Sequence, residues 1–223
     1  MIKLSKRLNA ISKMVDNNSV IADIGCDHAL LDIYLLQSKK IKKSIACDIT
    51  EGALNQARKN VNTYKINGID LRLADGLDRI YKKDNVNTII LSGLGDNKII
   101  NILMNNIDKL SDINSIIIQS NTNISKIRKA LVSISYYIED EVLIKENNII
   151  YTIIKFKRGI KKYSKKELNH GPILLKTKDY LFKELILDEI NSNNRIMKKL
   201  KNKNLRKKIK LFFKNIYLKN LLK

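Results

Sequence analysis

Short apolar runs alternate with helix-like segments through most of the chain, and this alternation restricts the fold more than any other feature. The runs that predict strands are Val20–Ile24, Lys43–Asp48, Ile69–Leu73, Thr88–Ser92 and Ser115–Gln119. The segments that predict helices are His28–Gln37, Glu51–Tyr64, Asn97–Ile107 and Ser125–Ser133. Continuous apolar runs are typical of strands covered on both faces, and their strict alternation with helices is typical of βαβ units. The sequence therefore predicts a doubly wound, mostly parallel α/β sheet.

Both ends of this region add an element. Two strand-like runs, Tyr137–Ile144 and Ile149–Lys157, are separated by only four polar residues. A connection of that length fits a hairpin, so we expect the sheet to end in an antiparallel pair. Before the first strand, apolar residues at helical spacing within Met1–Val15 predict an amphipathic helix.

The charge of the chain divides it into two domains. The formal net charge is +21, yet residues 1–150 contain 21 basic and 17 acidic residues, whereas residues 151–223 contain 22 basic and 5 acidic ones. The codon usage of an AT-rich genome could inflate lysine, but it does not explain an excess at one end. A confined cation excess is typical of a module that binds a polyanion, with nucleic acid the first candidate. We therefore predict a sheet domain over residues 1–157 and a basic helical hairpin over residues 158–223.

The basic hairpin is predicted from two helical patterns. The first begins with Leu181 and Leu185, and the second is an apolar stripe from Ile196 to Ile216 that we interpret as the core of the pair. A polar turn is expected between them at Asn191–Asn194. Basic side chains on this hairpin would supply affinity for an RNA backbone rather than base identity. The candidates for RNA contact are Lys198, Lys199, Lys201, Lys203, Arg206, Lys207, Lys208 and Lys210.

Acids and glycines stand where the predicted strands end. In a doubly wound sheet the ligand lies at the carboxyl ends of the strands, so these residues should meet at one edge. Gly25 allows a sharp turn and a close approach to a ligand, Asp48 can accept both hydroxyls of a ribose, and Asp75 can accept from an adenine amine. The residues expected at a cofactor are Asp23, Gly25, Asp27, His28, Asp48, Asp75, Gly76 and Gly93. Asp27 and His28 could instead be a helix cap and a loop packing residue.

This set fits S-adenosylmethionine better than a dinucleotide. The fingerprint GxGxxG is absent, because Gly25 is followed by Cys26-Asp27-His28-Ala29. A carboxylate at Asp27, where a pyrophosphate would lie, disfavours NAD and suits an ammonium group. S-adenosylmethionine carries an adenosine, an ammonium and a sulfonium, and we predict it as the cofactor.

Five motifs are more specific than their separate residues. They are DIGCDHALL at Asp23–Leu31, DITEG at Asp48–Gly52, DGL at Asp75–Leu77, Gly93-Leu94-Gly95 and Gln119-Ser120-Asn121. Together they resemble the bacterial tRNA (adenine(22)-N(1))-methyltransferase family. The resemblance implies a class I, Rossmann-like methyltransferase domain followed by a helical, coiled-coil-like domain, and methyl transfer to N1 of an adenine in tRNA. Such a transfer requires no general base, depends on proximity and orientation, and needs the base to leave its stack.

Two motifs depart from the family pattern. The family's Gly-Met-Gly-Gly is replaced here by Gly93-Leu94-Gly95-Asp96, and its Gln-Pro-Asn by Gln119-Ser120-Asn121. Asp96 adds a carboxylate beside the target pocket, or simply caps the following helix. The candidates for the adenine pocket are Asp96, Gln119 and Asn121, although Gln119 and Asn121 could only hydrogen bond within their loop.

Several classes of protein are excluded or disfavoured. The two cysteines, Cys26 and Cys47, are too few for a disulfide framework or a four-ligand zinc site. No apolar run reaches the roughly 18 residues of a membrane span. We therefore expect a monomeric, cytoplasmic enzyme with tRNA as its partner, no metal and no membrane. Two other functions stay open: a methyltransferase for another RNA or a small molecule, and a non-catalytic RNA-binding protein on a methyltransferase fold.

Overall fold

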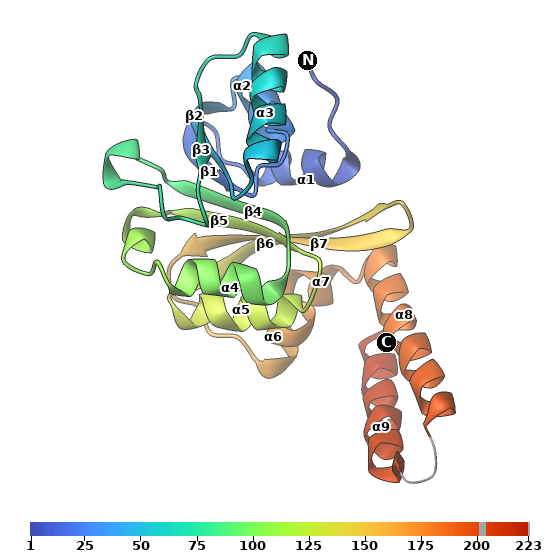
Figure 1. Ribbon diagram of the computed structural model, residues 1–223. Coiled ribbons are helices and arrows are strands. Elements are labelled where there is room, and N and C mark those ends of the chain that lie inside the picture. Colours follow the sequence, from blue (N-terminus) through green and yellow to red (C-terminus); the bar gives the residue numbers. More distant parts are fainter. Residues whose placement is uncertain (201–203, 223) are drawn as a thin grey trace. The chain divides into compact units, whose positions relative to one another are not determined.

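A seven-stranded sheet forms the centre of the first part of the chain (Figure 1). The structure is a computed structural model, and it describes residues 1–200 and 204–222. The strands are β1 (Ser19–Ile24), β2 (Ile41–Asp48), β3 (Ile69–Leu73), β4 (Thr88–Leu94), β5 (Ser115–Ser120), β6 (Tyr136–Glu146) and β7 (Ile149–Arg158). Their order is β3-β2-β1-β4-β5-β7-β6, with β1 to β5 parallel and β7 antiparallel to both β5 and β6. The predicted parallel sheet with a terminal hairpin is confirmed.

Helices cover both faces of the sheet, which is why its central strands are apolar throughout. On one face lie α1 (Lys6–Met14), α2 (Leu30–Gln37) and α3 (Glu51–Tyr64), and on the other α4 (Asp96–Met104), α5 (Ile124–Ser133) and α6 (Lys165–His170) (Figure 1). Two short 3-10 helices lie at Lys82–Asp84 and Lys109–Asp112. Every residue of β5 is buried, because helices contact it from both sides.

Helix α1 attaches the start of the chain to the sheet. The Ser5 side chain caps it by accepting from the backbone N–H of Leu8 at 3.3 Å. Its apolar face buries Ile11 and Met14 in a cluster that also contains residues of β1, α2, β4, β5 and β7. The predicted amphipathic helix is thus present, and its packing holds its first turn over the sheet.

Arg128 and Tyr163 connect the segment after the sheet to the sheet unit, since Arg128 Nη1 donates to the carbonyl of Asn169 at 3.4 Å. Arg128 on α5 donates to Glu141 on β6 at 2.7 Å, and both side chains are almost fully buried. The Tyr163 hydroxyl accepts from the backbone N–H of Ile138 at 2.9 Å. Contacts therefore divide the chain into Met1–Gly171 and Pro172–Lys223. The boundary predicted from charge, between residues 157 and 158, lies earlier in the chain. It marks where the density of basic residues rises, whereas the structural boundary marks where the contacts separate into two groups.

The second unit contains α7 (Pro172–Thr177), α8 (Tyr180–Lys199) and α9 (Leu205–Leu222). The turn predicted at Asn191–Asn194 is wrong, because α8 continues through it. The asparagines there serve a different purpose. Asn193 Nδ2 donates to Asn215 Oδ1 at 2.8 Å, and Asn215 Nδ2 donates to Asn194 Oδ1 at 2.8 Å. These amides join α8 to α9, and this pairing outweighs the low helix propensity of asparagine.

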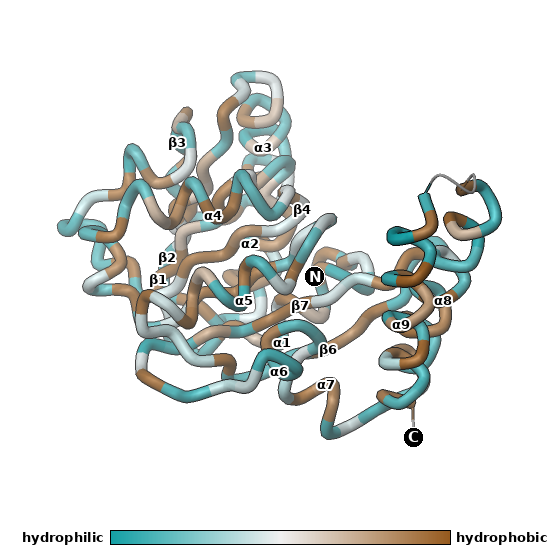
Figure 2. The backbone as a smooth tube through the Cα atoms, turned by 90° about the horizontal axis from the view of Figure 1, so that it is seen from below, coloured by the Kyte–Doolittle hydropathy of each residue, from teal (hydrophilic) through white to brown (hydrophobic). Residues whose placement is uncertain are grey.

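The apolar stripe expected to be the core of the helix pair is also misplaced. Leu205, Ile209 and Phe212 are 61%, 47% and 56% exposed. The buried positions of α9 are instead Asn215, Leu218 and Leu221. Apolar and polar residues are mixed along α8 and α9 (Figure 2), so the periodicity did not single out the inward face.

We predict that Asn215→Leu destabilises the helix pair by about 1–3 kcal/mol, because it leaves the buried amide of Asn193 without its acceptor. The double variant Asn193→Leu/Asn215→Leu should recover most of this loss, since both buried polar groups are then removed. Amide hydrogen exchange within α8 and α9 would measure the effect. A double variant less stable than the single one would contradict the prediction.

Candidate functional site

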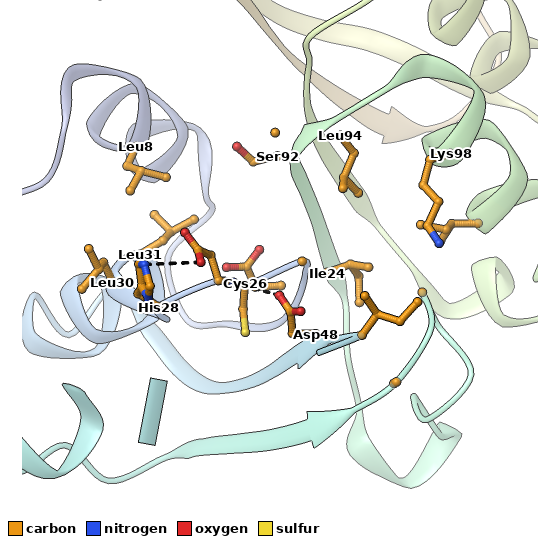
Figure 3. A pocket seen from close by; sticks show the side chains of 18 of the residues that line it. Leu8, Ile24, Cys26, His28, Leu30, Leu31, Asp48, Ser92, Leu94 and Lys98 are labelled. Carbon is orange, nitrogen blue, oxygen red and sulfur yellow. Dashed lines mark hydrogen bonds and ion pairs between the residues drawn. The ribbon is translucent and has the colours of Figure 1, made fainter. Parts of the chain in front are cut away.

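A cavity of about 390 Å³ opens at the carboxyl ends of β1, β2 and β4 (Figure 3). Its walls come from the loop after each of the first three strands, from the end of β4, and from side chains of α1, α2 and α4. All eight residues expected at a cofactor line it: Asp23, Gly25, Asp27, His28, Asp48, Asp75, Gly76 and Gly93. The parallel sheet has therefore brought together residues that are far apart in sequence, although their roles stay predictions.

The turn after β1 is shaped by Gly25. Its φ of +79° lies in the left-handed region that favours glycine. The backbone N–H groups of Gly25 and Cys26 both donate to the carbonyl of Cys47, at 2.8 and 3.0 Å. The Leu94 side chain lies 3.7 Å from where a Cβ on Gly25 would be. The turn is thus fixed to β2 on one side and closely approached by β4 on the other.

Asp48 connects the first two loops. Its Oδ1 accepts from the backbone N–H and the hydroxyl of Thr50, at 3.0 and 3.1 Å, and its Oδ2 accepts from the backbone N–H of Asp27 at 3.2 Å. The side chains of Asp27 and His28 are exposed and lie 3.4 Å apart. The carboxylate of Asp48 is therefore held at the end of β2, with lone pairs remaining for a ligand.

The loop after β3 presents a third acid. Asp75 is exposed, and its Oδ1 lies 2.7 Å from Nζ of Lys98 on α4. Gly76 has a φ of +61°, and a Cβ there would lie 3.0 Å from the Ile102 side chain. A side chain at position 76 would thus displace α4 or narrow the cavity.

The three candidates for the adenine pocket lie beside the cavity rather than among its lining residues. Asp96 is held by the Thr122 hydroxyl and by Lys126 Nζ at 3.3 Å, and the hydrogen bond from Thr122 lowers the pKa of its carboxyl. Gln119 is fully buried. Asn121 is exposed and donates to the carbonyl of Gly93, which lines the cavity, at 2.8 Å. Gln119 and Asn121 are therefore adjacent to the cavity edge, whereas Asp96 begins α4.

Two buried carboxyls form a pair below the cavity. Asp23 and Asp32 are both buried, and they hydrogen bond to each other. One oxygen of Asp32 accepts from the Ser44 hydroxyl, whereas its Oδ2 meets no conventional donor. Burial raises the pKa of Asp23 well above its usual range, and the neighbouring Asp32 carboxyl raises it further. The raised pKa of Asp23 and its hydrogen bond to Asp32 favour a proton shared between the two carboxyls.

The two cysteines are poorly suited to act as nucleophiles, and the described residues contain no cluster of metal ligands. Burial raises the pKa of the Cys47 thiol to about 12 and that of Cys26 still higher, so both stay protonated. Over residues 1–200 and 204–222, no three His, Cys, Asp or Glu side chains are grouped to hold a metal ion. In the same part of the chain, no helix has the length and apolarity needed to cross a bilayer.

Sequence reasoning missed three charged residues at the site. Arg7 and Lys98 line the cavity from α1 and α4, and Asp32 lies beneath it. Arg7 and Lys98 were two basic side chains among many, and only tertiary packing brings them to the cavity. Asp32 had a usable signal, because it is an acid within the otherwise apolar run that begins α2.

Comparisons with known proteins are consistent with this geometry. The family model for tRNA (adenine(22)-N(1))-methyltransferase matches residues 21–221. The Bacillus subtilis tRNA (adenine(22)-N(1))-methyltransferase is 32% identical over 206 residues, which cover 89% of this chain and 86% of that protein. A Streptococcus pneumoniae protein solved with S-adenosyl-L-methionine is 28% identical, with a TM-score of 0.91 over 99% of this chain and all of that one. The Mycoplasma capricolum protein solved with S-adenosyl-homocysteine is 31% identical, with a TM-score of 0.88 over 98% and 97% of the two chains.

The buried pair predicts an unusual pH dependence. The native pair keeps a proton at pH values where the unfolded chain has lost it, so the free energy of unfolding should fall as the pH rises above about 4. In Asp32→Asn the amide can donate to Asp23 and still accept from Ser44. We expect this variant to gain about 1 kcal/mol or more relative to the unmodified protein between pH 5 and pH 8.

Urea denaturation at both pH values would measure this gain. The exposed Asp78→Asn is the matched control and should follow the unmodified protein. Equal pH slopes for Asp32→Asn and the unmodified protein would rule out the shared proton.

Proposed function

The chain belongs to the tRNA (adenine(22)-N(1))-methyltransferase family, and we propose which of its residues bind the cofactor, the target base and the tRNA backbone. It is an S-adenosylmethionine-dependent enzyme that methylates N1 of adenine 22 in tRNA. In our proposal the cavity binds the cofactor and receives the target base, and the basic helix pair binds the tRNA backbone. The convergence of eight predicted cofactor residues on one cavity carries the proposal.

The cavity suits the cofactor in the chemistry of its donors and acceptors. When bound, S-adenosylmethionine supplies a methyl group on a sulfonium, which the N1 lone pair attacks in line. Asp48 would accept from the ribose hydroxyls, Asp75 from the adenine amine, and Asp27 from the ammonium group. Gly25 and Gly93, both at a φ of +79°, allow close backbone approach. The raised pKa of Asp23 favours its protonated form, which would limit the negative charge at this end of the site.

The reaction needs placement rather than proton transfer from the protein. The neutral N1 of adenine needs no base to become a nucleophile, and the product is a cation. Catalysis therefore depends on holding the base and the methyl group in line. The acids at the cavity also favour the cationic cofactor and product electrostatically.

We predict that Asp48→Ala weakens cofactor binding by about 10- to 100-fold, because two hydrogen bonds to a charged acceptor are lost. Calorimetry with S-adenosylmethionine measures binding, and transfer of a labelled methyl to total tRNA, followed by nucleoside mass spectrometry, measures function. Asp78→Ala, an exposed acid away from the cavity lining, is the control and should bind normally. Unchanged affinity in Asp48→Ala would remove Asp48 from the site, whereas a label on another base, or none, would overturn the function.

The proposed grip on tRNA is supported by the charge of the second unit. Lys198 and Lys199 end α8, and Arg206, Lys207, Lys208 and Lys210 lie in the first half of α9. All are exposed except Lys208, which is half-buried. Lys201 and Lys203 lie outside the described residues. A cluster of long basic side chains can contact several phosphates of a nucleic-acid backbone. An uncharged small substrate would offer this cluster nothing to bind.

We predict that changing Arg206, Lys207, Lys208 and Lys210 to Gln lowers tRNA affinity and makes it less salt-dependent. The slope of log K against log salt should fall by up to about 0.7–0.9 for each phosphate that the variant no longer neutralises. Cofactor affinity should not change. The control changes four exposed lysines of the first unit to Gln: Lys13, Lys42, Lys59 and Lys65. Equal losses of tRNA affinity in the two variants would show that total charge, rather than this cluster, binds tRNA.

We further infer that the enzyme acts as a monomer in the cytoplasm. The cytoplasmic location follows from the tRNA substrate.

A further inference from the structure

Three side chains beside the cavity form a hydrogen-bonded series, which we call the amide chain: Arg7, Gln119 and Asn121. Arg7 Nη1 donates to Gln119 Oε1 at 2.7 Å, Gln119 Nε2 donates to Asn121 Oδ1 at 3.0 Å, and Asn121 Nδ2 donates to the carbonyl of Gly93 at 2.8 Å. Gln119 is fully buried, whereas Asn121 is exposed. A buried link therefore connects a cation on α1 to an exposed amide next to the cavity.

The amide chain can run in only one direction. A guanidinium has N–H donors and no acceptor, so Gln119 must turn its oxygen toward Arg7. The backbone N–H of Gly93 donates to the same oxygen at 3.0 Å and enforces the same orientation. Gln119 then donates from its NH₂ group to Asn121, so the amide oxygen of Asn121 must be the acceptor. The orientation of the Asn121 amide is thus fixed on its oxygen side by Gln119, which is itself oriented by donors, and on its NH₂ side by the carbonyl of Gly93, which can only accept.

Arg7 is itself held firmly. Its Nη1 also donates to the Ser92 hydroxyl at 2.9 Å, and its guanidinium lies 5.6 Å from the centre of the Tyr151 ring. These contacts join α1, β4 and β7 around Gln119, so the first member of the amide chain has little freedom to turn.

Asn121 retains hydrogen-bonding capacity on both amide atoms. An amide oxygen has two lone pairs and an NH₂ has two hydrogens, and the contacts within the described residues use one of each. An asparagine side chain can pair with the N6 amine and N7 of adenine together. N1 lies on the other edge of the base and must stay free to attack the methyl group. The N6–N7 edge therefore lets a residue identify adenine without blocking N1.

We propose that Asn121 recognises the N6–N7 edge of the target adenine, and that Arg7 is a positioning residue that fixes the direction of the Asn121 amide through Gln119. This inference rests on the proposed function, because it concerns the adenine pocket of the same site. It assigns Arg7, which also lines the cavity, a role that acts through Gln119, and it gives Asn121 a specific edge of the base.

Gln119→Glu tests the direction of the amide chain. The carboxylate still accepts from Arg7 and Gly93, so the fold should be kept, but it cannot donate to Asn121. The Asn121 oxygen would then face a carboxylate while its NH₂ is held by the carbonyl of Gly93, so the side chain should leave its present position. We expect kcat/KM for tRNA to fall about 10-fold or more, with unchanged cofactor affinity and no drop in Tm. Full activity would show that the direction is irrelevant and that Arg7 only attaches α1.

Two changes at Arg7 separate its hydrogen-bonding role from packing. Arg7→Lys keeps a donor-only cation, whereas Arg7→Met keeps the length without a donor. Arg7→Lys should retain most of the activity on tRNA that Arg7→Met loses, and Arg58→Met, which removes an exposed arginine of α3, should leave activity unchanged. Equal losses in the two Arg7 variants would contradict the positioning role.

A modified substrate tests which edge Asn121 recognises. A tRNA with 7-deazaadenosine at the target position lacks N7 but keeps N1 and N6. We expect its kcat/KM to be about 10-fold lower with the unmodified enzyme and unchanged, relative to normal tRNA, with Asn121→Ala. Equal methylation of both tRNAs by the unmodified enzyme would overturn the inference while leaving the proposed function intact. Failure to methylate normal tRNA would instead refute the function itself.

Discussion

The parallel pairing of β1 with β2 and β4 is the constraint on which the rest of the site depends. Parallel strands end at the same edge, so loops far apart in sequence meet there without any covalent link. Asp23, Asp48 and Gly93 share one cavity for this reason. The buried, β-branched character of the strands makes that arrangement rigid, because a shift in register would disrupt the packing of apolar side chains against the helices on both faces.

The same edge concentrates acids that would repel one another in a poorly solvated site. The structure limits this repulsion in different ways. Asp48 is hydrogen bonded to backbone and hydroxyl donors, Asp75 pairs with Lys98, and burial raises the pKa of Asp23 beside Asp32. The cavity is thus acidic enough for a cationic ligand without holding several uncompensated buried charges.

Charge is distributed unevenly between the two units. Met1–Gly171 contains 28 basic and 18 acidic residues, and some of its ions form specific pairs such as Arg128–Glu141. Pro172–Lys223 contains 15 basic and 4 acidic residues in a much shorter segment. The helix pair has few acids, and one of them, Glu189, pairs with Lys214 at 2.6 Å. Its packing is instead specified by buried amides, in which Asn215 bonds to both Asn193 and Asn194. This arrangement leaves the basic side chains available to a polyanion.

The alternating fold, the terminal hairpin and eight of the residues that line the cavity could be predicted from the sequence. Hydrophobic periodicity, strand ends and glycines are local signals, and a parallel sheet brings the residues at its strand ends to one edge. Features that depend on contacts between distant segments became visible only in the folded chain. Folding placed Arg7 beside Gln119, paired Asp32 with Asp23, and continued α8 through Asn191–Asn194. Propensity and hydrophobic spacing failed in the helix pair because a buried asparagine is stable only where a partner helix supplies its hydrogen bonds.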